Sequence, residues 1–301
     1  AWHFAKMLTR TLQVPVGIIS CAWGGSRVEG WLPRNILESY PDIKLEEELK
    51  RGWNGRWWEY HSPMIMYNAM LHPLRHYTIK GFLWYQGESN VGRHNVHAER
   101  LKTMADLWRK EFGGTAETLP FYLAEIAPWE GYGGKDGISG ALLREAQHQA
   151  AKLIGNSGCI VTNDLVKPCE APQIHPANKR DVGYRFAYMA LQKTYGIRSI
   201  LGQSPEYERM EIHDKEIEVF FRHAEDGLSP WTDIVGFEIA GADGKFQPAT
   251  ARYHERNRSI IVSSPQVTAP KNVRYCFKNF QIGNLTNFRG LAVVPFRTDK
   301  E

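Results

Sequence analysis

Apolar runs alternate with amphipathic segments along the first two thirds of the chain. Short apolar runs that predict strands cover residues 14–20, 79–85, 121–126 and 159–162. Apolar residues three and four positions apart predict helices over residues 94–112, 141–153 and 178–195, and Gly113 ends the first of them. Alternating strands and helices predict an α/β fold, with a parallel sheet that helices cover on both faces.

The hydrophobic pattern changes near Gly202, after which no long helix is evident. The short strands predicted there cover residues 212–221, 233–240, 249–254, 259–264 and 273–277. Turn sequences such as Asp243-Gly244 separate them. The chain therefore divides into an α/β domain over residues 1–201 and a β-rich C-terminal domain over residues 202–301.

Two segments fall outside this alternation. Residues 1–8 predict part of an amphipathic helix, and a chain that starts inside a helix resembles a fragment. Residues 31–76 are irregular and rich in aromatic side chains, which predicts either a substrate-shaping loop or a packed subdomain. The aromatic and histidine residues of this segment include Trp53, Trp57, Trp58, Tyr60, His61 and Tyr67.

Composition excludes several classes of protein. With 43% hydrophobic and 23% charged residues, the chain has an ordinary globular composition. A net charge of +4 with scattered basic residues argues against a nucleic-acid partner, and no apolar run reaches the length of a membrane span. The four cysteines form no CxxC pair, which argues against a structural zinc site. Cys159 and Cys169 are read either as a disulfide or as free thiols.

Polar residues follow the apolar run at 79–85, where a strand of a parallel sheet ends. The segment Trp84 to Asn90 places the carboxamide of Gln86 and the carboxylate of Glu88 on either side of a glycine. Ligands of open α/β sheets bind at the carboxyl ends of the strands. Gln86 therefore offers an amide donor for an oxyanion, as do the backbone N–H groups of Gly24 and Gly25.

A histidine completes this chemistry. His175 lies in a loop that leads into the predicted helix at 178–195. An ester hydrolase needs a nucleophile, a base, a group that orients the base, and oxyanion donors. His175 is the best candidate for the base, and Glu88 is the best candidate for the group that orients it.

These residues resemble the sialate O-acetylesterase family, a branch of the SGNH hydrolases that also includes acetylxylan esterases. The segments that carry the resemblance are Pro15 to Ser20 with Trp23-Gly24-Gly25, Trp84 to Ser89, Arg144 to Gln147, Ile174 to Pro176 with Asn178-Lys179, Val273 to Tyr275, Gly283 to Leu285 and Pro295 to Asp299. The resemblance implies an SGNH-hydrolase (flavodoxin-like) sheet whose first strand is missing from this chain.

The family's nucleophile is a serine in a Gly-Gln-Ser-Asn block on that first strand, which the resemblance places upstream of Ala1. The block Gly202-Gln203-Ser204-Pro205 is rejected, because it follows the last helix and has proline in place of asparagine. Ser89 directly follows Gln86-Gly87-Glu88, the segment that would supply the oxyanion donor and the acid, so it is not taken as the nucleophile either. An upstream segment that carries the serine is therefore the expected partner, and this chain alone is expected to be inactive.

The resemblance also implies roles for other residues. The family often has aspartate three residues before its histidine, but Pro172 occupies that position here. In related acetylxylan esterases the glutamate of the Gln-Gly-Glu motif serves as the acid of the catalytic triad, so the resemblance also indicates Glu88 for that role. Trp23, Tyr85 and Arg144 are candidate substrate-binding residues. No metal or cofactor is implied, and secretion or a periplasmic or lysosomal location is expected.

The predicted activity is therefore removal of O-acetyl groups from sialic acid or another glycan through a serine acetyl-enzyme. An acetylxylan esterase and a carbohydrate-binding protein without catalysis are alternatives, the latter because the chain contains no credible nucleophile of its own. A third alternative is a glycoside hydrolase with Glu88 and Glu125 as paired carboxylates.

Overall fold

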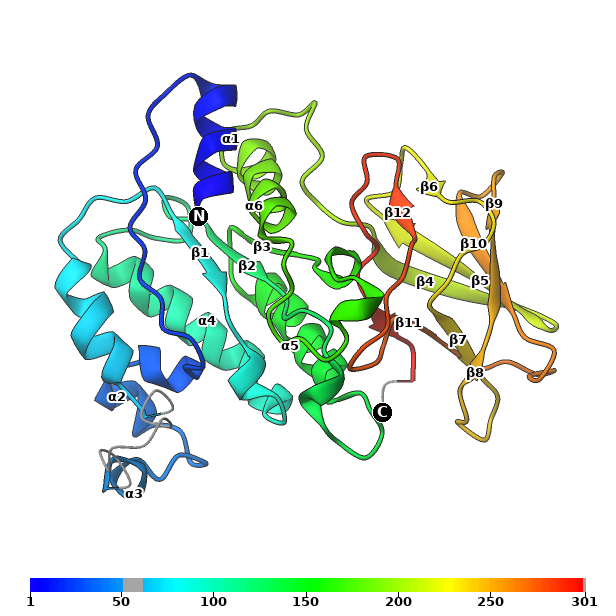
Figure 1. Cartoon of the computed structure of the whole chain (residues 1–301), viewed down its shortest axis with the longest axis horizontal. Helices are drawn as coiled ribbons and strands as arrows, with labels where there is room; N and C mark the ends of the chain where they lie inside the picture. Colours follow the sequence, from blue (N-terminus) through cyan, green and yellow to red (C-terminus); the bar gives the residue numbers. More distant parts are fainter. Residues whose placement is uncertain (51–61, 300–301) are drawn as a thin grey trace. The chain divides into compact units, whose positions relative to one another are not determined.

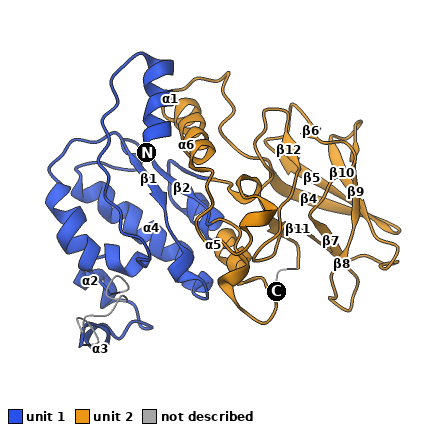
Figure 2. Cartoon of the chain, in the orientation of Figure 1, with its two compact units in different colours: residues 1–126, 146–159 blue, residues 127–145, 160–301 orange. Residues whose placement is uncertain are grey.

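The computed structural model describes residues 1–50 and 62–299, which form two compact units (Figure 1, Figure 2). The first unit comprises residues 1–126 and 146–159, and the second comprises residues 127–145 and 160–301. Trp53, Trp57, Trp58, Tyr60 and His61 lie outside the described residues. The domain boundary at residues 201 and 202 differs from the limits of these units and stays a prediction.

A small parallel sheet organises the first unit. Strand β1 (Phe82–Tyr85) pairs in parallel with β2 (Phe121–Ala124), and β3 (Ser157–Ile160) lies on the other side of β2. All four residues of β2 are buried, as expected for the middle strand of such a sheet. The predicted class, a parallel sheet with helices followed by an antiparallel region, is confirmed (Figure 1).

Helices of the predicted lengths accompany this sheet. The terminal helix α1 (Trp2–Leu12) ends at Gln13, whose φ of 56° is left-handed. Helix α4 (His94–Glu111) follows β1, and α5 (Ser139–Leu153) follows β2. The shorter helices α2 (Arg34–Leu37) and α3 (Leu45–Lys50) lie in the irregular region.

The described part of the irregular region is a packed subdomain. Trp31 lies edge-to-face against Trp84 of β1, with ring centroids 5.5 Å apart, and Trp84 packs in the same way against Trp108 of α4 at 5.4 Å. Tyr67 and Leu71, in the one-turn π-helix η3 (Tyr67–Leu71), belong to the same core. Burial of these large side chains supplies the apolar area that holds the region on the sheet.

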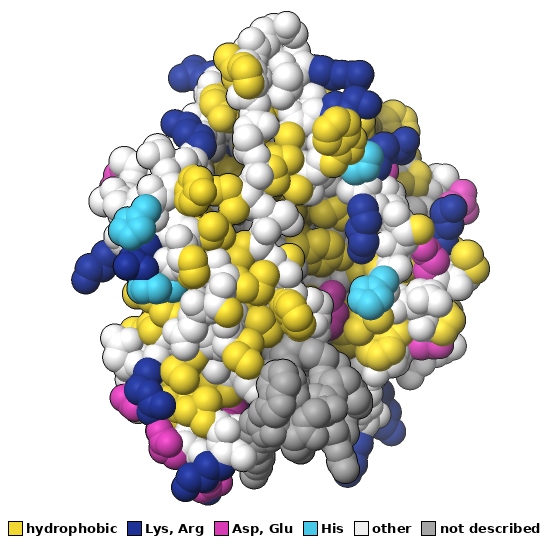
Figure 3. Space-filling model, turned by 60° about the vertical axis from the view of Figure 1, so that its left-hand side comes forward, with side chains coloured by type: hydrophobic (Ala, Val, Ile, Leu, Met, Phe, Trp, Pro, Cys, Tyr) yellow, Lys and Arg dark blue, Asp and Glu magenta, His cyan; other side chains and the backbone are white. Residues whose placement is uncertain are grey.

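The strand predicted at residues 14–20 is wrong. This segment is irregular, and none of the described strands forms a ladder with it. Without a ladder partner its side chains remain in solvent, and Val14, Ile18 and Ile19 are each more than two-fifths exposed. Figure 3 shows a face on which hydrophobic side chains gather with few charges among them.

The second unit contains helix α6 (Lys179–Lys193) and an antiparallel region. One four-stranded sheet has the order β4-β5-β10-β9, from β4 (Glu206–His213), β5 (Glu216–Arg222), β10 (Ser259–Ser263) and β9 (Thr250–His254). The other has the order β13-β11-β7-β8, from β13 (Phe296–Arg297), β11 (Asn272–Tyr275), β7 (Phe237–Ala240) and β8 (Gln247–Pro248). A two-stranded sheet joins β12 (Thr286–Asn287) to β6 (Leu228–Ser229).

The single strand predicted at residues 212–221 is a hairpin. Strands β4 and β5 turn at Asp214, which adopts a φ of 52°. Aspartate tolerates this left-handed conformation, so the apolar run at 217–221 belongs to the second strand alone. The predicted strand at 233–240 is shorter and begins at Phe237.

Two further features bear on the sequence predictions. None of the four cysteines, all of which lie within the described residues, forms a disulfide, and Cys169 is exposed. Among the described helices, none has the length and apolar character that crossing a membrane requires.

Candidate active site

A tight turn presents Gly24 and Gly25 at the surface of the first unit. The Ser26 N–H donates to the Trp23 carbonyl at 3.4 Å, and the Ser26 hydroxyl donates to the same oxygen at 2.8 Å. Gly25 has a φ of 76°, which favours glycine. A Cβ at Gly24 would meet nothing within 4 Å, and the Trp23 side chain is 55% exposed. The turn therefore leaves open space beside an exposed aromatic ring.

Ser89 holds this turn beside the end of β1. Its hydroxyl donates to the Gly25 carbonyl at 2.7 Å, and Arg27 Nε donates to the Ser89 carbonyl at 3.2 Å. These bonds join two segments more than sixty residues apart in the sequence. The sequence prediction brought together Gly24, Gly25 and the Gln86–Glu88 segment, and the structure places them in one unit, joined through Ser89.

Gln86 uses its amide within this junction. Its Nε2 donates to the Ser26 carbonyl at 2.9 Å and to Asn90 Oδ1 at 2.8 Å. The reverse amide orientation would turn Gln86 Oε1 toward two acceptors, so the network fixes which atom faces them. Both amide hydrogens therefore hold the loop in this structure, and donation by Gln86 to an oxyanion stays a prediction.

Asn90 is a residue that the sequence analysis missed. It is fully buried, its Oδ1 accepts from the Val28 N–H at 3.0 Å, and its Nδ2 donates to Glu29 at 3.0 Å. Its place in the Gln86-to-Asn90 segment was visible, but its partners lie about sixty residues away. A buried amide whose oxygen and nitrogen both have hydrogen-bond partners favours a single loop conformation.

A buried charge network continues from Asn90. Glu29 pairs with the buried guanidinium of Arg100 and lies 3.4 Å from Arg93, and Arg100 also donates to Asp42 at 2.6 Å. Burial by itself would raise the pKa of Glu29, but hydrogen bonds and the two arginines outweigh burial and lower it. Glu29 therefore stays ionised and accepts from Asn90.

Glu88 begins a short 3₁₀ turn, η5 (Glu88–Asn90), directly after Gly87. Gly87 has a φ of 152°, which L side chains rarely adopt, so the sharp exit from β1 depends on glycine. Burial raises the pKa of Tyr85, and the charges of Glu88 and Glu125 raise it further. Tyr85 is therefore a neutral phenol within the electrostatic range of Glu88.

Gln147 of α5 bridges the ends of two strands. Its Nε2 donates to the Gln86 carbonyl at 2.8 Å, and its Oε1 accepts from the Ile126 N–H at 2.9 Å. Gln147 is buried, so it satisfies two backbone groups that leave the sheet after β1 and β2. The sequence analysis used this residue only as part of a family motif.

A buried cluster lies beside Gln147 along α5. His148 Nε2 is 2.8 Å from Glu125, which is fully buried just after β2. Burial lowers the pKa of His148, but Cys159 and Glu125 together hold that pKa well above its usual value. The charged imidazole therefore neutralises Glu125 inside the unit.

His175 lies in the second unit and is exposed. Glu170 braces its loop, since one carboxylate oxygen accepts from the Lys167 N–H and the other from the Ala177 N–H, both at 2.8 Å. Asn178 then caps α6 by accepting from the Asp181 N–H at 3.2 Å. Glu88 and His175 belong to different units, so their pairing stays a prediction.

Arg144 is buried in the second unit, where its guanidinium donates to the Lys278 carbonyl. This contact gives Arg144 a structural role, and its predicted contact with substrate stays a prediction. Among the described residues, one group of His, Cys, Asp or Glu side chains is close enough to hold a metal ion, and it contains Glu211, His213 and Glu218. None of these three belongs to the candidate active site.

The structure defines an α/β protein with a candidate ligand site at the carboxyl end of a parallel strand. Comparisons with known proteins give its family. The family described as "Carbohydrate esterase, sialic acid-specific acetylesterase" matches residues 1–192. The chain therefore belongs to this family of carbohydrate esterases.

Individual relatives agree with this assignment. The chain is 27% identical to the sialate O-acetylesterase of Rattus norvegicus over 72% of its own length, and 28% identical to that of Homo sapiens over 70%. These matches cover 48% and 42% of the relatives, so the chain spans about half the length of the curated relatives that it matches.

A solved structure provides a further comparison. A carbohydrate acetylesterase from Xanthomonas citri matches with a TM-score of 0.83 and 33% sequence identity. The match covers 100% of this chain and 65% of that one.

Proposed function

We propose that this chain is part of a carbohydrate esterase that removes O-acetyl groups from sialic acid or another acetylated glycan. The observation that carries the proposal is the junction of the Gly24–Gly25 turn with the Gln86–Glu88 segment at the carboxyl end of β1. Ligands bind at such strand ends in open α/β sheets. The family and the names of the relatives support an acetyl ester as the substrate.

The proposed reaction uses a serine acetyl-enzyme. His175 takes the serine proton as the oxygen attacks the acetyl carbonyl, and Glu88 orients His175. The Gly24 and Gly25 N–H groups stabilise the oxyanion, each contributing about 3 kcal/mol to the barrier reduction. His175 then protonates the departing sugar oxygen, and water hydrolyses the acetyl-enzyme.

The serine is proposed to come from a segment upstream of Ala1, because neither serine that the sequence analysis considered is suited to the role. The Ser89 hydroxyl donates to the Gly25 carbonyl, and Ser204 is buried. Apolar side chains at residues 14–20 are exposed, and this supports the proposal that an additional segment packs beside them and covers them.

Binding of a sugar is proposed to involve Trp23, whose exposed ring lies beside the glycine turn. Tyr85 and Arg144 keep their proposed roles toward substrate, Tyr85 as a neutral phenol near Glu88. Degradation of glycans outside the cytoplasm, with secretion or a periplasmic or lysosomal location, is the proposed setting.

The test measures acetate release by the full-length protein from an aryl acetate, O-acetylated sialic acid and acetylated xylan. His175→Ala should abolish turnover and keep the far-UV circular dichroism of the wild type. His76→Ala is the matched control, because His76 is also exposed, and it should keep full activity. Faster release from xylan would assign the acetylxylan esterase alternative.

Absence of turnover by the full-length protein, together with retained glycan binding, would replace the proposal with the carbohydrate-binding alternative. The glycoside hydrolase alternative is disfavoured, because Glu125 is fully buried and paired with His148. An unchanged glycan chain length alongside acetate release would exclude it.

A further inference from the structure

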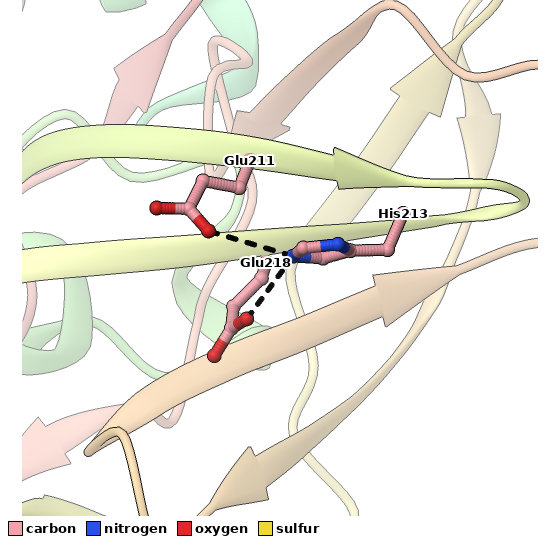
Figure 4. Close-up of side chains that lie close together, drawn as sticks. All are labelled: Glu211, His213 and Glu218. Atoms are coloured by element: carbon pink, nitrogen blue, oxygen red, sulfur yellow. Dashed lines mark ion pairs between the residues drawn. The ribbon is translucent and has the colours of Figure 1, made fainter.

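Three ligand-type side chains converge on the hairpin of β4 and β5, outside the candidate active site (Figure 4). Glu211 and His213 are two residues apart on β4, so they face the same side of the sheet. The strand register places Glu218 of β5 directly opposite Glu211. Figure 4 shows the His213 ring directed between the two carboxylates.

The two distances from His213 to the carboxylates match the spacing of neighbouring ligands around a tetrahedral metal ion. His213 Nε2 lies 3.3 Å from Glu218 Oε2 and 3.6 Å from Glu211 Oε2. Bonds of about 2.0–2.2 Å from Zn²⁺ to nitrogen or oxygen separate neighbouring tetrahedral ligands by roughly 3.3–3.6 Å. The ligand atoms of all three residues lie within 4.8 Å of one another.

The charges at this position favour a cation. Two carboxylates directly opposite each other across strands repel, and the repulsion destabilises the pair. Arg209 contacts the other oxygen of Glu211, which leaves the oxygen near His213 in place for a ligand. Two carboxylates and a neutral imidazole would balance a divalent ion.

Glu218 is oriented as metal-binding carboxylates are. Its side chain is 7% exposed, and its Oε1 accepts from Ser259, from Asn257 Nδ2 at 2.8 Å and from His254, whose Nδ1 lies 3.0 Å away. These contacts leave Oε2 facing His213. Outer hydrogen bonds of this kind fix a carboxylate before an ion binds.

We propose that Glu211, His213 and Glu218 bind a divalent transition-metal ion of the Zn²⁺ type, with solvent as the fourth ligand. The set combines one nitrogen and two carboxylate oxygens, which suits zinc better than the all-oxygen sites of calcium or magnesium. The bound ion would link the ends of the two strands, so binding should also raise the thermal stability of the chain.

The test is titration of the metal-free chain with Zn²⁺ in a calorimeter, with Co²⁺ absorption as a second readout. We expect saturable binding and the visible bands of tetrahedral Co²⁺. His213→Ala and Glu211→Gln should each weaken Zn²⁺ binding at least about tenfold, because even outer-shell changes cost that much. Both side chains are about half exposed, so these variants should fold.

Glu208→Gln is the matched control, since Glu208 is another exposed carboxylate of β4 outside the cluster. It should keep the wild-type affinity and the same thermal shift with Zn²⁺. The proposal is overturned if the wild type shows no saturable binding. It is also overturned if His213→Ala and Glu211→Gln bind as the wild type does, since the three residues would then form an ion pair only.

Discussion

The side-chain amide of Gln86 donates a hydrogen bond to the side-chain oxygen of Asn90, with 2.8 Å between nitrogen and oxygen. The same Asn90 oxygen accepts from the Val28 N–H, and its nitrogen donates to Glu29. One buried amide therefore holds the end of β1 to the segment that follows the glycine turn. The candidate oxyanion donors depend on this junction for their position.

Replacement of Asn90 tests that dependence. Asn90→Ala should lower the free energy of unfolding by about 3 kcal/mol, because it leaves buried polar partners unsatisfied. Urea denaturation measures the change. Asn68→Ala is the control at an exposed position and should stay within about 0.5 kcal/mol of the wild type. Equal losses in both variants would contradict a structural role for Asn90.

The sequence predicted the parts of this region that depend on local pattern. The position of Gln86 and Glu88 after a strand of the parallel sheet is confirmed, although only Trp84 of that strand is buried. Helix α4 and the start of α6 after Asn178 are confirmed as well. Periodicity and capping residues act over a few positions, which is why these elements were readable.

The remaining features depend on contacts that are distant in the chain. Glu29 contacts Asn90 across 61 positions and Arg100 across 71, and no local pattern marks such partners. The apolar run at 14–20 looked like a strand, but a strand also needs a ladder partner. The turn at Asp214 was missed because aspartate, and not glycine, adopts the left-handed conformation there.

Removal of the brace around His175 should affect catalysis more than folding. Glu170→Ala removes both acceptors for the Lys167 and Ala177 N–H groups, so the His175 loop should sample more conformations. We expect kcat of the full-length protein on an aryl acetate to fall about tenfold, with thermal stability nearly unchanged because the loop is exposed. Glu225→Ala is the control, and it should keep the wild-type kcat. An unchanged kcat in Glu170→Ala would show that the loop needs no brace.

Gln147→Ala should weaken the link between the ends of β1 and β2. The variant leaves the Gln86 carbonyl and the Ile126 N–H without their partner, which should cost about 2 kcal/mol of unfolding free energy. Gln149 lies on the exposed side of the same helix, so Gln149→Ala should change the free energy of unfolding little. Chemical denaturation of both variants measures the difference, and the prediction fails if Gln149→Ala is the less stable of the two.

The buried His97 should make stability depend on pH in a defined window. Burial lowers the pKa of His97 to about 4, and neither ring nitrogen has a hydrogen-bond partner. An unfolded histidine titrates near pH 6.5, so between about 6.5 and 4 the unfolded state binds a proton that the folded state does not. Unfolding is therefore favoured as the pH falls, by about 1.4 kcal/mol for each pH unit in this window.

His97→Leu and His97→Gln both remove this titration. Each variant should lose less stability than the wild type between pH 6.5 and 4, while above pH 7 all three proteins should show parallel pH dependence, because His97 is then neutral in both states. Urea denaturation across this range measures the slopes. Glu29 affects the pH dependence mainly below this window. Its pKa is lowered in the folded state, so the stability it contributes is lost only as the pH falls below the pKa of an unfolded glutamate, about 4.3. A wild-type slope in both variants would mean that His97 takes up its proton in the folded state as readily as in the unfolded state.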